Sequence, residues 1–141
     1  MENKKIKIRG LGEIKSFEDL EAYKLARTFR KRIYELIGKL PKDERYNLSS
    51  QMRRAAVSLT NNIAEGYGRY HYQENIQFCR QSRGSLYELL DDLNVCLDEH
   101  YISEEEYLSY RNDAFHLLKV LNAYISRTKE LQQDYKKTMI V

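Results

Sequence analysis

Apolar residues recur at helical spacing in four long stretches of this chain, at about 17–40, 48–66, 72–99 and 104–133. Apolar side chains three or four positions apart line one face of an α-helix. Long helices joined by short turns favour antiparallel neighbours. The sequence therefore predicts an all-α fold, an elongated antiparallel up-down-up-down four-helix bundle over residues 16–134.

Residues at the ends of these stretches carry helix-start signals. The segments that begin at Ser16 and Ser103 each resemble a capping box, with an acidic residue three positions later. Asn47 is a good N-cap for the second helix. Outside the bundle, we expect residues 1–15 to form a basic arm and residues 135–141 to form a tail.

Composition narrows the class of protein further. The chain has 141 residues, which suits one domain, and it contains one proline. No apolar run is long enough to cross a membrane, and the basic N-terminus lacks the apolar core of a secretory signal. We therefore expect a cytoplasmic protein. Cys79 and Cys96 have no motif partner and are expected to be small core residues.

The residue types that usually perform catalysis are scattered. His71, His100 and His116 are isolated, and paired Glu-x-x-His metal motifs are absent from the sequence. Phosphate-binding and hydrolase motifs are also absent. We expect no enzymatic activity, no metal site and no cofactor.

Charge is unevenly distributed along the chain. Residues 84–113 carry nine acidic and one basic side chain, although the whole chain has a net charge of +3. The bundle topology gathers acidic residues at one end and basic residues at the other. Alternating aromatic and basic residues at the 66–72 turn could stack on unpaired bases and neutralise phosphates, or could seal the bundle end. The nucleic-acid-binding hypothesis names Tyr67, Arg69, Tyr70, His71, Lys4, Lys5, Lys7, Arg9, Lys136 and Lys137.

A second basic stripe lies on the first predicted helix. Lys24, Arg27 and Lys31 share one helical face. This stripe is either a solvated surface or an extension of a nucleic-acid footprint.

Small residues suggest a close contact between the second and third helices. Antiparallel register places Gly84 level with Ala55 and Ala56, and a glycine within a helix costs about 1 kcal/mol relative to alanine. Close approach of another helix, in this chain or in another subunit, would explain that cost. The same register places Arg53 or Arg54 level with Glu88. Either an arginine of this pair forms an ion pair with Glu88, or one of the two faces a partner or nucleic acid.

These motifs together resemble a known family. The segments Arg53–Arg69 and Phe78–Leu89, with 17–20 and 40–48, are similar to the bacterial 23S ribosomal RNA intervening-sequence proteins. That family is similar in fold to the accessory variability determinant of diversity-generating retroelements. The resemblance covers about residues 16–130. Its motif and packing positions are Arg53, Arg54, Ala55, Ala56, Asn62, Glu65, Gly66, Gly68, Arg83, Gly84, Ser85 and Glu88.

The resemblance implies a homopentameric ring without established enzymatic activity. It also implies nucleic-acid binding in some members and a reverse-transcriptase partner in the retroelement branch. Together with the charge pattern, it leads us to expect weak, mostly sequence-independent binding of RNA or DNA. The alternative is a scaffold that docks a cytoplasmic protein, such as a reverse transcriptase, and has no direct nucleic-acid role.

Overall fold

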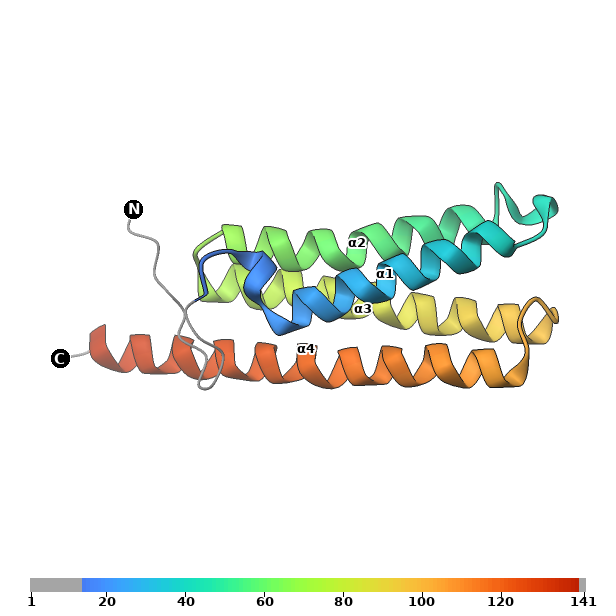
Figure 1. Cartoon of the computed structure of the whole chain (residues 1–141). Helices are drawn as coiled ribbons and strands as arrows, with labels where there is room; N and C mark the ends of the chain where they lie inside the picture. Colours follow the sequence, from blue (N-terminus) through green and yellow to red (C-terminus); the bar gives the residue numbers. More distant parts are fainter. Residues whose placement is uncertain (1–13, 140–141) are drawn as a thin grey trace.

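The protein is an elongated bundle of four α-helices, described over residues 14–139 by a computed structural model (Figure 1). No strand occurs in this range, so the predicted all-α fold class is confirmed. The elements are η1 (Phe17–Asp19), α1 (Glu21–Lys39), η2 (Lys42–Glu44), α2 (Leu48–Gly68), α3 (Tyr72–Asp98) and α4 (Glu104–Met139).

All four helices contribute to a single apolar core. α1 packs on α2, α2 on α3 and α3 on α4, and α4 also contacts α1. The apolar stripes read from the sequence are the faces that meet, because burying them removes large side chains from water. The large apolar side chains that are completely enclosed are Leu20, Ile33, Met52, Leu59, Ile63, Leu86, Leu89, Leu93 and Leu121.

The first and last helices differ from their expected limits. The capping box at Ser16 is present, but it begins the short 3-10 turn η1 rather than a helix over 17–40. Leu20 then adopts an extended backbone (ψ 131°) and is fully buried before α1 begins. α4 continues to Met139, past the expected end at 133, and its last turns project beyond the α2–α3 turn (Figure 1).

Two other predicted caps have different outcomes. The Ser103 hydroxyl accepts a hydrogen bond from the Glu106 amide, and the Glu106 carboxylate accepts one from the Ser103 amide, so this capping box is confirmed. Asn47 precedes α2 as expected, but its side chain does not cap the helix. Its amide nitrogen instead lies 3.4 Å from a carboxylate oxygen of Glu44.

The close approach between α2 and α3 occurs at Gly66, not at Gly84. A Cβ atom on Gly66 would lie 2.8 Å from Asn75 Oδ1 and 3.0 Å from Phe78 Cβ. A Cβ atom on Gly84 would have no described neighbour within 4 Å. The predicted contact of Gly84 with Ala55 and Ala56 within one chain is therefore wrong, because Gly84 lies on the outer face of α3.

Short hydroxyl side chains join α2 to α3. Ser82 donates a hydrogen bond of 2.6 Å to the carbonyl of Leu59, and Ser85 donates one of 2.8 Å to the Ser58 hydroxyl. The Asn62 amide also donates to the Ser58 hydroxyl. These bonds give Asn62 and Ser85 a structural role, because they satisfy polar groups at a packed helix surface.

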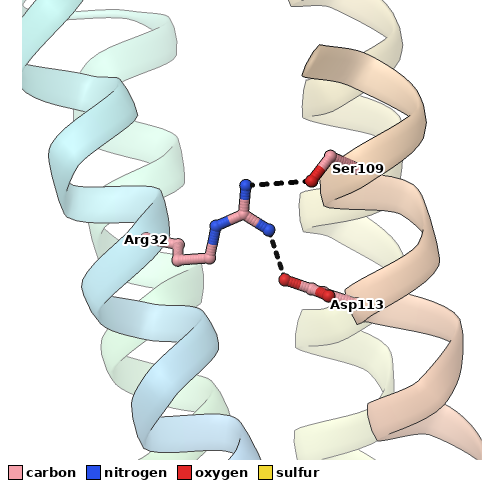
Figure 2. Close-up of polar contacts among 3 residues, drawn as sticks. All are labelled: Arg32, Ser109 and Asp113. Atoms are coloured by element: carbon pink, nitrogen blue, oxygen red, sulfur yellow. Dashed lines mark hydrogen bonds and ion pairs between the residues drawn. The ribbon is translucent and has the colours of Figure 1, made fainter. Parts of the chain in front are cut away.

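An arginine bridges α1 and α4 (Figure 2). Arg32 forms an ion pair with Asp113 and donates a 3.3 Å hydrogen bond to Ser109. Its guanidinium carbon also lies 4.2 Å from the centre of the Tyr110 ring. Arg32 is thus neutralised within the chain and is not available as a free cation.

His100 is expected to limit stability. It lies just after α3 with φ 60°, and the Tyr101 amide closes the helix end on the Cys96 carbonyl at 2.8 Å. Glycine adopts this left-handed conformation without the steric cost of a Cβ atom. We expect His100→Gly to raise the free energy of unfolding by about 1 kcal/mol in urea denaturation.

His116→Gly provides the control for this substitution. His116 is exposed in the interior of α4, where glycine should destabilise the helix by up to about 1 kcal/mol. Equal effects of the two substitutions would contradict a backbone explanation.

A search of the described residues for membrane-spanning segments found none, since no helix there combines sufficient length with sufficient apolar character.

Candidate nucleic-acid interface

An open groove runs along the outer surface between α1 and α2. We call it the α1–α2 groove, and its volume is about 800 Å³. It includes Tyr34 from α1, two residues that precede α2, and the outward face of α2. The lining residues are Tyr34, Arg45, Tyr46, Ser50, Arg53, Arg54, Val57, Ser58, Asn61 and Asn62.

Aromatic rings and guanidinium groups lie together in this groove. The Arg53 guanidinium carbon is 5.6 Å from the centre of the Tyr34 ring, and that of Arg45 is 5.4 Å from the centre of the Tyr46 ring. Tyr34 is 40% exposed and Tyr46 is 87% exposed. The groove therefore offers planar stacking surfaces beside cations, which is the combination that binds unpaired bases and their phosphates.

The groove is electrostatically one-sided. Three arginines line it, and none of the lining residues is acidic. Within residues 14–139, ion pairs join Arg32 to Asp113, Arg69 to Glu65 and Arg127 to Glu130, and they involve none of the groove arginines.

The interpretation in which Arg53 or Arg54 pairs with Glu88 is therefore wrong for the described part of the chain. Arg53 stacks on Tyr34, and Arg54 lies at the outer surface of α2. The alternative, that one of these arginines faces a partner or nucleic acid, stays a prediction, and both side chains are exposed.

The end of the bundle at the α2–α3 turn, which the sequence predicts to be basic, has less unpaired positive charge than the α1–α2 groove. Arg69 forms a 2.8 Å ion pair with Glu65, and its guanidinium carbon lies 5.3 Å from the centre of the Phe78 ring. Tyr67 is half-buried against the core, and burial raises the pKa of its hydroxyl. Tyr70 and His71 are exposed at the α2–α3 turn.

α4 passes beside this turn. The Gln132 amide donates a 3.0 Å hydrogen bond to Gln73, and the Tyr135 and Tyr72 rings lie 6.2 Å apart. The exposed Lys136 and Lys137 follow in the last turns of α4. The structure thus places the described members of the predicted set at one end of the bundle, and their binding role stays a prediction. Lys4, Lys5, Lys7 and Arg9 lie outside the described residues.

A second groove lies between α2 and α3, on the other side of the exposed face of α2. We call it the α2–α3 groove, and its volume is about 660 Å³. Its lining residues are Gln51, Arg54, Gly84, Tyr87, Glu88, Asp91 and Asp92. The carboxylates on its α3 wall make it unsuited to phosphate. Arg54 lines both grooves.

Asp92 is the unusual ionisable group of the α2–α3 groove. The residue is only 9% exposed, and none of the described residues forms a hydrogen bond or an ion pair with its carboxylate. Burial and the nearby carboxylates of Asp91 and Glu88 raise the pKa of Asp92 to about 6.

Cys79 and Cys96 are free and buried, as expected for core residues.

No group of three or more His, Cys, Asp or Glu side chains within residues 14–139 has an arrangement suited to a metal ion.

Sequence reasoning did not identify Tyr34, Arg45 or Tyr46 as site residues. The sequence pattern that could have located this groove is the exposed face of the second predicted helix. Positions 50, 53, 54, 57, 58 and 61 alternate with the buried positions of the same helix. Tyr34 and the pair before α2 join that face only after the chain folds.

The fold and these surfaces define a class of protein, a four-helix bundle with charged grooves on its flanks. The family model described as "23S rRNA-intervening sequence protein" matches residues 18–123, most of the chain. The chain belongs to this family, which confirms the resemblance noted from its motifs.

A solved structure has a similar fold. It is a crystal structure of a protein with unknown function from the S23 ribosomal protein family of Bacteroides thetaiotaomicron, with a TM-score of 0.68 and 24% sequence identity. The match covers 74% of this chain and 97% of that protein. At this level of identity it supports the fold alone. A search of curated proteins gave no match.

Proposed function

We propose that this protein is a non-enzymatic, homo-oligomeric accessory protein that binds RNA or DNA weakly and mostly independently of sequence. The observation that carries the proposal is the α1–α2 groove, with three arginines, two exposed tyrosines and no acidic residue in its lining. Arginine binds phosphate, and tyrosine stacks on any unpaired base. We therefore place the binding surface on the flank of the bundle rather than at its end.

The stacking geometry favours single strands. The bases of a duplex are already stacked on one another, and tyrosine rings reach the faces of unpaired bases more easily. Backbone neutralisation by Arg45, Arg53 and Arg54 would release about three counterions. The logarithm of the binding constant should then fall with the logarithm of salt concentration with a slope of about −2.

The test compares two charge-reversal variants of the full chain. Fluorescence anisotropy would measure binding of single-stranded and hairpin RNA at two salt concentrations. We expect Arg45→Glu/Arg53→Glu to weaken binding at low salt by about tenfold or more. Arg69→Glu/Lys136→Glu makes the same change in charge at the end of the bundle and should have a smaller effect.

Equal binding by the wild type and the Arg45→Glu/Arg53→Glu variant would remove the groove from the proposal. A larger loss in the Arg69→Glu/Lys136→Glu variant would place binding at the end of the bundle instead. Circular dichroism would confirm that both variants are folded.

A protein-docking scaffold is the second candidate, favoured by the α2–α3 groove. Its acidic wall repels phosphate and suits a basic protein surface. A stoichiometric protein partner in a pull-down, without nucleic acid and without RNA binding by the purified chain, would favour this role. The five-subunit stoichiometry implied by the resemblance is part of our proposal, and sedimentation equilibrium would measure it.

A further inference from the structure

Gly84 lies near the middle of α3 with open space beside it. An added Cβ atom would meet none of the described atoms within 4 Å, so packing within the chain does not require a glycine here. Glycine in a helix interior costs about 1 kcal/mol relative to alanine. On an exposed face, the missing side chain allows the backbone of another helix to come closer.

Asp92 lies in the same groove and provides an independent observation. The residue is only 9% exposed, and none of the described residues donates a hydrogen bond to its carboxylate or forms an ion pair with it. None of the fully enclosed side-chain oxygens in the described range lacks a partner, so the carboxylate oxygens of Asp92 open onto the groove. Asp91 and Glu88 add negative charge beside it. A buried carboxylate is stabilised when a cation or a donor reaches it, so this groove suits a ligand that carries positive charge.

The chain itself carries a matching cationic surface. Lys24, Arg27 and Lys31 are exposed on α1, and none of them takes part in an ion pair within the described range. They extend over about 10 Å of helix, and the carboxylates from Glu88 to Asp92 extend over about 6 Å. The two charged strips are opposite in sign, and the cationic strip is long enough to cover the carboxylate strip.

We propose that the α2–α3 groove binds the Lys24–Lys31 strip of a second copy of this chain, with Gly84 admitting its helix α1 and a cation reaching Asp92. This inference rests on the homo-oligomer in the proposed function and names its contact surfaces. Every subunit has both surfaces, and the two surfaces differ. The contact is therefore heterologous, and it forms a closed ring when the rotation between neighbouring subunits divides a full turn.

Two charge-reversal variants of the full chain test this contact without nucleic acid. Light scattering coupled to size exclusion would measure the mass of Glu88→Lys/Asp91→Lys and of Arg27→Glu/Lys31→Glu at low salt. We expect each variant to self-associate at least about tenfold more weakly than the wild type, because like charges then face each other. An equimolar mixture should associate more tightly than either variant alone, since each altered surface is complementary to the altered surface of the other variant. A ring with an odd number of subunits keeps one like-charged contact.

Asp98→Lys/Glu99→Lys is the matched control. It reverses two exposed carboxylates on or next to the same helix, outside the groove, and should keep the wild-type mass. Circular dichroism would establish that every variant retains its helices.

The outcomes separate this contact from the rest of the proposal. Wild-type mass in both groove variants, or a mixture that stays dissociated, would overturn the proposed contact and assign the groove to another partner. A wild type that is monomeric at all concentrations would overturn both the contact and the homo-oligomer. RNA binding is tested with substitutions at other residues. An absence of RNA binding would therefore leave the self-association result unaffected.

Discussion

Gly66→Ala is expected to lower the free energy of unfolding by about 2 to 4 kcal/mol. The new methyl group would lie 2.8 Å from Asn75 Oδ1 and 3.1 Å from the Asn75 carbonyl oxygen. Asn75 cannot move away freely, because it is buried and donates a 3.0 Å hydrogen bond to the Tyr124 hydroxyl. The substitution therefore either forces α2 away from α3 or breaks a buried polar contact.

Gly84→Ala is the control for Gly66→Ala, and it should have the opposite sign. The added methyl group is free of contact with the described residues, so the higher helix propensity of alanine should stabilise the monomer by up to about 1 kcal/mol. Urea denaturation followed by circular dichroism at low protein concentration would measure both variants. Destabilisation by Gly84→Ala, or little change in Gly66→Ala, would contradict the assignment of the close approach to Gly66.

Asp92→Asn is expected to raise stability at neutral pH. The folded protein raises the pKa of Asp92 from its ordinary value to about 6, so the folded state holds this proton more tightly than the unfolded state. Ionisation therefore opposes folding as the pH rises through about 4 to 6, and the penalty is complete above pH 6. We expect the substitution to add about 1 to 2 kcal/mol at pH 7.5, a moderate value because the groove is open to solvent.

The pH dependence distinguishes this cause from a packing effect. Wild type and Asp92→Asn should have similar stability near pH 4 and diverge by pH 7. The groups that face Asp92 in the groove are Glu88 and Asp91 on α3, with Gln51 and Arg54 on α2. Measurements at high salt and low protein concentration would minimise self-association, and Asp98→Asn would serve as the exposed control. A difference that is constant from pH 4 to pH 8 would contradict the electrostatic explanation.

The fold could be predicted from the sequence because apolar spacing reports which face of a helix is buried. The position of each residue along the long axis of the bundle could also be estimated, because two antiparallel helices joined by a short turn run side by side in opposite directions. Rotation of each helix about its own axis was not fixed by that estimate. The estimated register therefore sets Gly84 against Ala55 and Ala56, although Gly84 faces outward and Gly66 makes the close contact.

The candidate interface was harder to predict for a related reason. Arg53 and Arg54 were recognised as motif residues, but a sequence does not show which charges find partners after folding. Arg32 and Arg69 form ion pairs within the chain, whereas none of the described residues forms an ion pair with Arg53 or Arg54. Tyr34 lies on α1 and meets Arg53 only through the packing of α1 on α2. Tyr46 lies in the segment before α2, stacks with the neighbouring Arg45 and shares the groove with Arg53 and Arg54.

Arg54 gives the two proposed binding events a common dependence. Its side chain lines the groove assigned to nucleic acid and also the groove assigned to a second subunit. One guanidinium group turned toward a phosphate is less available to the carboxylates on the other side. Those carboxylates then attract the cationic strip of a second subunit more strongly. Binding of RNA and assembly would therefore be positively coupled, and thermodynamic reciprocity requires each to strengthen the other by the same factor. Nucleic acid would then promote assembly, and the assembled protein would bind nucleic acid more tightly than a single subunit does.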